Sequence, residues 1–267
     1  MRKKTNMSDR TLLLAGNWKM NHDHLEAISS VQKLAWALED AKLDESRCEV
    51  VVIPPFTDIR SVQTLVQGDK LWLKYGAQDV SQHAPGAHTG EIAATFLTRL
   101  GCSYVVIGHS ERRADNHETN EVVAAKVRAA LSAELTPILC VGESLQQRQE
   151  KTHVDFTLDQ LEESLAGFDA SALEGLVIAY EPVWAIGTGE TATAADAAEM
   201  AAAIRARLAE KYGNGMAEST RILYGGSVKA DNVAEIVADA DVDGALVGGA
   251  SLSGPDFAAL CKAAVAK

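Results

Sequence analysis

Short runs of consecutive apolar residues alternate with longer amphipathic stretches from one end of this chain to the other. In Val50-Val51-Val52-Ile53 and Leu176-Val177-Ile178-Ala179 every position is apolar, which is typical of parallel strands covered on both faces. Strands of a half-exposed antiparallel sheet would instead alternate between apolar and polar side chains. About eight such runs predict strands at 12–15, 50–53, 71–77, 104–107, 137–141, 176–180, 221–224 and 244–247.

A helical pattern follows each predicted strand. The clearest one starts after Thr193, a suitable N-cap residue, is rich in alanine, the best helix former, and ends before Gly213. The expected helices span 24–39, 59–67, 91–100, 121–133, 155–165, 194–212, 230–238 and 255–266.

Eight strand–helix units without a low-complexity linker fit one domain of about 250 residues, the usual size of a (β/α)8 barrel. We therefore predict an α/β, single-domain (β/α)8 barrel spanning residues 11–267, preceded by an N-terminal extension over residues 1–10. A doubly wound parallel sheet is the alternative architecture.

The chain carries 25 basic and 37 acidic residues, a formal net charge of −12. This balance disfavours partners such as nucleic acids and anionic membranes, which need clusters of Lys and Arg. No apolar run approaches the ~20 residues of a membrane span. The four cysteines contain no CxxC pair and the histidines show no ligand spacing, so we expect a cytoplasmic protein without a metal site.

In a (β/α)8 barrel, reactive groups lie where strands end and loops begin, and three ionisable side chains stand at such points. Lys19 follows the first strand beside Asn17 and is placed to neutralise an anion, unless it is an ordinary exposed lysine. His109 follows the fourth strand, and Ser110 and Glu111 are candidates to cap a short helix there. The N-terminus of such a helix would disfavour a charged ring and favour a neutral hydrogen-bond donor, whereas the alternative is a histidine with a purely structural role.

Glu181 ends the sixth strand directly before Pro182, which restricts its backbone, so this carboxylate is a candidate general base. The alternative is a solvated glutamate at a strand end. The following residues, 183–189, are apolar and end in glycines, which suits a lid that excludes water.

Glycines and a serine at the last two strand ends indicate a phosphate site. Barrels commonly hold phosphate there with main-chain N–H groups, although tight-turn glycines are the competing interpretation. The candidate donors are Ser227, Gly248, Gly249 and, from the lid, Gly187. Residues 187–192 match G-x-G-x-x-A, but no strand leads directly into them, so we expect no dinucleotide and no other cofactor.

Several long motifs in the same order resemble the triosephosphate isomerase family over nearly the whole chain. They are Gly16-Asn17-Trp18-Lys19-Met20-Asn21, Gly108-His109-Ser110-Glu111-Arg112-Arg113, residues 180–189 from Tyr180 to Gly189, Tyr224-Gly225-Gly226-Ser227 and Gly248-Gly249-Ala250-Ser251.

The resemblance implies an aldose–ketose isomerase of glycolysis and gluconeogenesis that interconverts dihydroxyacetone phosphate and D-glyceraldehyde 3-phosphate through an enediolate, without a cofactor. It further implies that Glu181 is the base, that His109 polarises the carbonyl, and that Lys19 and Asn17 hold the substrate. Gly187, Ser227, Gly248 and Gly249 resemble the phosphate cradle, and Glu111 resembles a supporting carboxylate near the lysine.

The loop at 78–91 resembles the family's third loop, which inserts into a partner subunit, so the resemblance also implies a homodimer with Thr89 at the inserted tip. Two departures from the family pattern are Glu190, where a lysine is common, and Asp115-Asn116, where an aromatic residue is frequent.

Two other functions remain open at this stage. One is another phosphate-binding barrel enzyme, such as an aldolase or a synthase, although a Schiff-base aldolase would need a lysine within a strand near the mouth of the barrel. The other is a non-catalytic barrel that only binds metabolites, which the presence of Asn17, Lys19, His109 and Glu181 disfavours.

Overall fold

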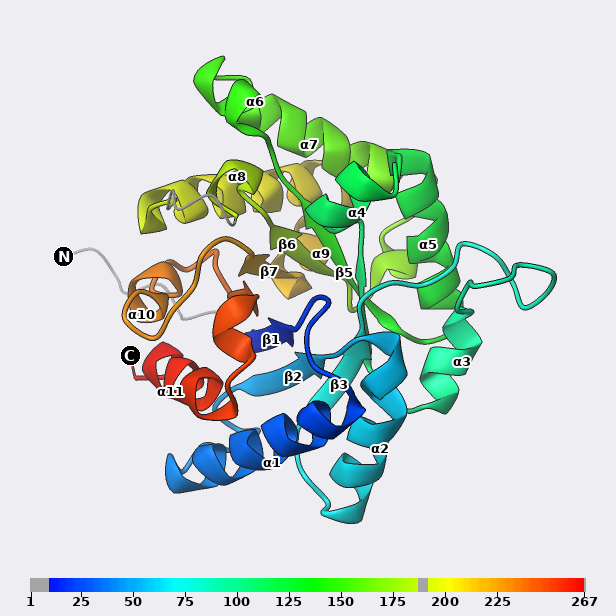
Figure 1. The fold of residues 1–267 in the computed structure, drawn as a ribbon. Coiled ribbons are helices and arrows are strands. Elements are labelled where there is room, and N and C mark those ends of the chain that lie inside the picture. The colour runs from blue at the N-terminus through cyan, green and yellow to red at the C-terminus, as the bar shows by residue number, and fades with distance from the viewer. Residues whose placement is uncertain (1–9, 187–191, 267) are drawn as a thin grey trace.

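The computed structural model describes residues 10–186 and 192–266. Within them, parallel strands pair in chain order and β8 pairs back with β1, so the sheet closes into a barrel (Figure 1). The predicted (β/α)8 barrel is confirmed, and the closure excludes the open, doubly wound sheet. The strands are β1 (Leu13–Asn17), β2 (Glu49–Ile53), β3 (Lys74–Ala77), β4 (Tyr104–Ile107), β5 (Thr136–Val141), β6 (Val177–Tyr180), β7 (Arg221–Tyr224) and β8 (Gly244–Val247).

Successive strand residues face two different apolar regions. Leu13 and Ala15 pack with Val51 and Ile53 in a cluster inside the barrel, whereas Leu14 belongs to the larger cluster between barrel and helices. Both strand faces are therefore buried, which is why the strands are apolar at consecutive positions.

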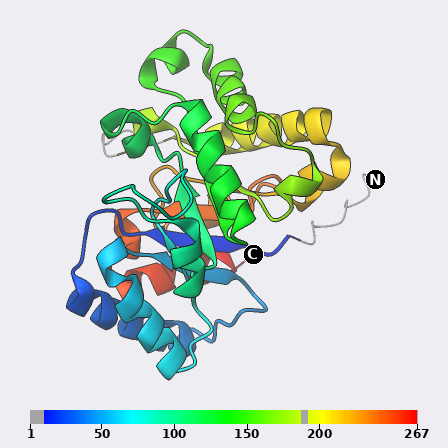
Figure 2. The ribbon, with the colours of Figure 1, turned by 90° about the vertical axis from the view of Figure 1, so that its right-hand side faces the viewer.

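Helices surround the barrel, and Figure 2 shows β1 crossing the molecule between α1 and α2 on one side and α7 and α8 on the other. The α-helices are α1 (His24–Asp40), α2 (Ile59–Gly68), α3 (Ala94–Arg99), α4 (Ser110–Asp115), α5 (Asn120–Ser132), α6 (Leu145–Gln149), α7 (His153–Ser164), α8 (Ala194–Tyr212), α9 (Asn214–Ser219), α10 (Val233–Ile236) and α11 (Gly254–Ala264). Short 3₁₀ helices are η1 (Phe56–Asp58), η2 (Ser171–Leu173), η3 (Val183–Ala185) and η4 (Gly249–Ser251).

Most predicted helices are present, with three differences. Helix α3 starts later than expected because Ala93 is extended, with φ −69° and ψ 143°. Helix α10 has only four residues, whereas the predicted helix spanned 230–238. Helices α6 and α9 were not predicted; Gly213, with φ 89°, ends α8 and redirects the chain into α9.

The loop between β3 and α3 extends away from the barrel beside α3 and α5 (Figure 1). Residues 82–90 of this loop are exposed, and the rings of His83 and His88 stack at 4.0 Å between centroids. This protruding loop contains Thr89, the residue predicted at a subunit contact.

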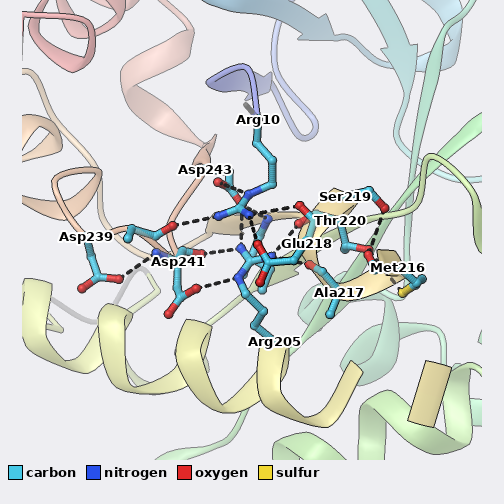
Figure 3. A network of polar contacts seen from close by, with 12 residues as sticks. Arg10, Arg205, Met216, Ala217, Glu218, Ser219, Thr220, Asp239, Asp241 and Asp243 are labelled. Carbon is cyan, nitrogen blue, oxygen red and sulfur yellow. Dashed lines mark hydrogen bonds and ion pairs between the residues drawn. The ribbon is translucent and has the colours of Figure 1, made fainter. Parts of the chain in front are cut away.

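A network of charged side chains ties the segment before β1 to the barrel (Figure 3). Arg10, which we assigned to the N-terminal extension, donates to Asp243 Oδ1 at 2.7 Å and to the carbonyl oxygens of Glu218 and Ala240. Asp243 Oδ2 also accepts from Arg205 Nη2 at 2.8 Å. This network joins α8 and α9 to the residues just before β8, at the end of the barrel where the strands begin.

In the described ranges, no helix is long and apolar enough to cross a membrane.

Candidate active site

A cavity of about 880 Å³ opens at the carboxyl ends of the strands. Eight of the ten residues predicted from the sequence line it: Asn17, Lys19, His109, Glu111, Glu181, Ser227, Gly248 and Gly249. Thr89 lies elsewhere, in the protruding loop. Gly187 and Glu190 lie outside the described residues, whereas Asp115 ends α4 and Asn116 follows it.

Glu181 follows β6 directly and is only 2% exposed. Its backbone passes so close to Gly142 that a Cβ there would lie 1.7 Å from the Glu181 carbonyl oxygen. On the other side, a Cβ at Gly225 would lie 2.9 Å from Glu181 Cγ. Two glycines therefore make the room in which this side chain is held.

Both carboxylate oxygens of Glu181 have a donor. The Ser110 N–H donates to Oε2 at 2.9 Å, and His109 Nε2 lies 2.9 Å from Oε1. Burial alone raises the pKa of Glu181, but the nearby His109, the Ser110 N–H and Lys19 together lower it below the ordinary value. Glu181 is therefore ionised near neutral pH and is able to accept a proton.

His109 caps α4 with its own ring. The Glu111 N–H donates to Nδ1 at 3.2 Å, so the cap is the histidine rather than Ser110 or Glu111 as we predicted. Burial lowers the pKa of His109, and the Glu181 carboxylate more than offsets this and raises it. The Glu111 N–H nevertheless decides the tautomer of the His109 ring, because Nδ1 cannot accept its hydrogen bond and carry a proton at once. The ring proton is accordingly on Nε2, directed at Glu181.

Lys19 stands at the cavity wall with an unusual backbone, at φ 54°. Asn17 Oδ1 accepts from the Lys19 N–H at 3.0 Å, and Gln78 Nε2 donates to the Lys19 carbonyl oxygen at 2.7 Å. The ammonium group pairs with Glu111 Oε1 at 2.5 Å. These contacts hold the lysine in position and bring the predicted lysine and its supporting carboxylate together.

The chain after β7 and β8 also lines the cavity. Gly225, Gly226 and Ser227 follow β7, and Gly248 and Gly249 follow β8 at the start of η4, where a Cβ at Gly248 would lie 3.6 Å from Lys19 Cε. Ser251 Oγ donates to the Gly248 carbonyl oxygen at 2.7 Å, which fixes this turn. The predicted phosphate-binding groups from the two strand ends thus line the same cavity.

Sequence reasoning missed two residues that shape the site. Glu143 is fully buried and accepts from Tyr180 Oη at 3.1 Å and from Trp184 Nε1 at 2.8 Å, and burial raises its pKa despite these donors. Gln78 bonds the carbonyl oxygens of Lys19 and Ile53. Both follow strands β5 and β3, and that position was the one signal that could have marked them.

An ionised carboxylate, an imidazole with its proton directed at it, and an ammonium group converge at the carboxyl end of a (β/α)8 barrel. This combination defines a barrel protein equipped for acid–base chemistry on a small substrate. In the described part of the chain, no three His, Cys, Asp or Glu side chains are grouped so that they could hold a metal ion.

Comparisons with known proteins identify the family. The triosephosphate isomerase family model matches residues 12–264. The triosephosphate isomerase of Streptomyces avermitilis is 59% identical over 96% of this chain and 98% of its own length, and that of Corynebacterium efficiens is 60% identical over 94% and 95%. The crystal structure of triosephosphate isomerase from Bartonella henselae superposes with a TM-score of 0.82 at 38% identity, covering 94% and 98% of the two chains. The chain belongs to the triosephosphate isomerase family.

Proposed function

We propose that this protein interconverts dihydroxyacetone phosphate and D-glyceraldehyde 3-phosphate by proton transfer through an enediolate. The observation that carries the proposal is the buried, ionised Glu181 held between the Ser110 N–H and His109 Nε2 at 2.9 Å from each. The family to which the chain belongs supports the same activity.

In this mechanism, the Glu181 carboxylate removes a proton from the substrate carbon beside the carbonyl group. The electron pair of the broken C–H bond forms the carbon–carbon double bond of the enediolate, and the carbonyl oxygen becomes negative. His109 Nε2–H donates a hydrogen bond to this oxygen, and the Lys19 ammonium group stabilises its charge. His109 then passes its Nε2 proton to this oxygen and takes the hydroxyl proton from the carbon that lost its hydrogen, so the negative charge moves to the second oxygen. Glu181 returns its proton to the original carbonyl carbon, and the second oxygen becomes the new carbonyl oxygen, which completes the isomerisation without an external electron donor or acceptor.

The remaining residues hold the substrate. Asn17 positions Lys19, and Glu111 pairs with it. We assign phosphate binding to main-chain groups of Ser227, Gly248 and Gly249, with Gly187 as a further donor. No metal or organic cofactor has a part in these steps.

A coupled assay with purified protein and glyceraldehyde 3-phosphate tests this function. We expect turnover in both directions and no change when a chelator is added. Absence of isomerisation would refute the proposal and return attention to an aldolase, a synthase or a non-catalytic barrel.

We also propose that the protein is a cytoplasmic homodimer in which residues 11–267 form the catalytic barrel domain and 1–10 the extension. The protruding loop supports the dimer, since residues 82–90 are exposed around Thr89, and Met20 beside the site is 95% exposed. Sedimentation velocity at micromolar concentration should give a dimer, and Thr89→Arg should weaken it. A fully active monomer would contradict this assembly.

A further inference from the structure

We propose that Arg148 is a positioning residue for the reaction, because its guanidinium group contacts both segments that flank residues 187–191, one before and one after. This inference rests on the proposed function and concerns a side chain outside the substrate cavity. Arg148 contacts Trp184 on the segment that follows Glu181 and Asp196 at the start of α8.

The segment before residue 187 is held through Trp184. Arg148 Cζ lies 5.5 Å from the centroid of the indole ring, within the range of a cation–π contact. The Trp184 Nε1–H donates to Glu143 Oε1 at 2.8 Å, and Arg148 Nη1 is 3.9 Å from the same oxygen. The indole is therefore held by its face and by its edge, three residues after Glu181.

The segment after residue 191 is held through Asp196, the third residue of α8. Asp196 Oδ1 pairs with Arg148 Nη2, while Oδ2 accepts from the Thr193 N–H at 2.8 Å and from Thr193 Oγ1 at 2.7 Å. Burial raises the pKa of Asp196, but the Thr193 donors and the Arg148 charge lower it below the ordinary value. One ionised carboxylate thus joins the helix cap at Thr193 to Arg148.

Arg148 contacts both segments from α6, a short helix whose N-terminus is capped. In α6, Ser144 and Gln147 form a capping box, and the Ser144 N–H donates to Gln147 Oε1 at 2.9 Å. Glu199 Oε2 lies 3.7 Å from Arg148 Nη1 and equally far from His153 Nε2, which adds a contact between α6, α7 and α8.

One side chain therefore sets the separation between Trp184 and Thr193. Without it, the chain would leave β6 and enter α8 with fewer restraints, and the geometry of Glu181 would vary more. A rate depends steeply on such geometry, so a residue remote from the reacting atoms can lower it.

The test compares Arg148→Gln with Arg207→Gln. Arg207 is a matched control, because its side chain is similarly exposed, at 25% against 20%, and pairs with Glu162 and Glu210 away from the cavity. We expect kcat/KM to fall about tenfold for Arg148→Gln and to stay within about twofold for Arg207→Gln. Arg148→Lys should restore only part of the loss, since lysine lacks the planar group that contacts Trp184 and Asp196 together.

A double-mutant cycle isolates the contact to Asp196. Asp196→Asn keeps an oxygen for the α8 cap and removes the charge, so Arg148→Gln/Asp196→Asn should lose less than the product of the two single losses. Amide hydrogen exchange supplies a readout without turnover: the N–H groups of Ala185 and Asp196 should exchange faster in Arg148→Gln and unchanged in Arg207→Gln.

Three results would overturn the proposal: a kcat/KM for Arg148→Gln within twofold of the wild type, an equal loss in Arg207→Gln, or unchanged exchange at both amides. Failure of the proposed function is distinguishable, because the wild type would then show no isomerisation while the exchange comparison would still test the restraint.

Discussion

Replacing Glu181 with glutamine keeps the size of the side chain but reverses the hydrogen bonding of one of its two polar atoms. Both carboxylate oxygens face donors, the Ser110 N–H and His109 Nε2–H, each at 2.9 Å. An amide offers one oxygen and one NH₂ group, so it must direct a donor at a donor. The ring cannot relieve this by moving its proton to Nδ1, because that nitrogen accepts from the Glu111 N–H.

The structure sets the size of two effects. A buried donor left without an acceptor costs about 1–3 kcal/mol of unfolding free energy, which lowers the melting temperature by roughly 2–4 °C per kcal/mol in a protein of this size. Loss of the general base should reduce kcat by about 10²–10⁴-fold. Glu181→Gln is therefore expected to be both inactive and less stable.

The stability difference depends on pH in a direction that follows from the carboxylate. The pKa of Glu181 is below its ordinary value in the fold, so the ionised group stabilises the fold above the unfolded pKa of about 4.3. This contribution is lost as the pH falls through the folded pKa. The wild type should exceed Glu181→Gln in stability at pH 7, and the difference should shrink below about pH 4.

Thermal melts at one protein concentration, together with the coupled isomerase assay, measure both effects. Glu111→Gln serves as the stability control, because the Glu111 side chain is 49% exposed and its ion pair with Lys19 contributes little. A Glu181→Gln protein at least as stable as the wild type would refute the hydrogen-bond assignment. Unchanged turnover would remove Glu181 from the role of base.

Three further predictions follow from other parts of the structure. Gly225→Ala would place a Cβ 2.9 Å from Glu181 Cγ, so kcat should fall at least tenfold, whereas Gly215→Ala, with no atom within 4 Å, should leave kcat unchanged; equal activities would refute the steric argument. Asp243→Asn removes the charge between Arg10 and Arg205 and should cost about 3 kcal/mol in urea unfolding with kcat unaltered, since the network lies at the opposite end of the barrel; a wild-type midpoint would contradict it. The four cysteines are buried, and burial raises the pKa of Cys48 to about 11, so a thiol reagent at pH 8 should label them only on unfolding; rapid labelling of the native protein would count against this burial.

The pattern of apolar residues predicted the strands because both of their faces are buried. It located β4, β7 and β8 to the residue, whereas it extended the third strand over 71–77 although pairing begins only at Lys74. Residues 71–73 pack as apolar side chains without joining the sheet. Helix α6 carried a readable signal, the Ser144/Gln147 capping box, while α9 was obscured by Gly213 and Gly215, which usually mark a turn.

The site was predictable where a polar residue interrupts a buried strand end, as Lys19, His109 and Glu181 do. The roles of Gln78 and Glu143 were not predictable in this way, because their hydrogen-bond partners are distant in sequence. Gln78 bonds carbonyl oxygens 59 and 25 residues away, and Trp184 meets Glu143 across 41 residues. The ring of His109 as a cap for α4 was missed for a different reason: histidine is not among the usual N-cap residues.

The net charge of −12 is a sum over the whole chain and does not report how charged groups are arranged inside the cavity. Inside the cavity the charged groups already have partners: Lys19 pairs with Glu111 at 2.5 Å, and the Glu181 carboxylate faces the His109 Nε2–H at 2.9 Å. A bound triose phosphate must therefore exchange partners: its carbonyl oxygen takes the His109 N–H from Glu181, and the freed carboxylate oxygen turns to the substrate C–H. Because that oxygen loses a donor, the pKa of Glu181 should rise on binding, and the carboxylate becomes a stronger base at the moment when its proton acceptor role begins.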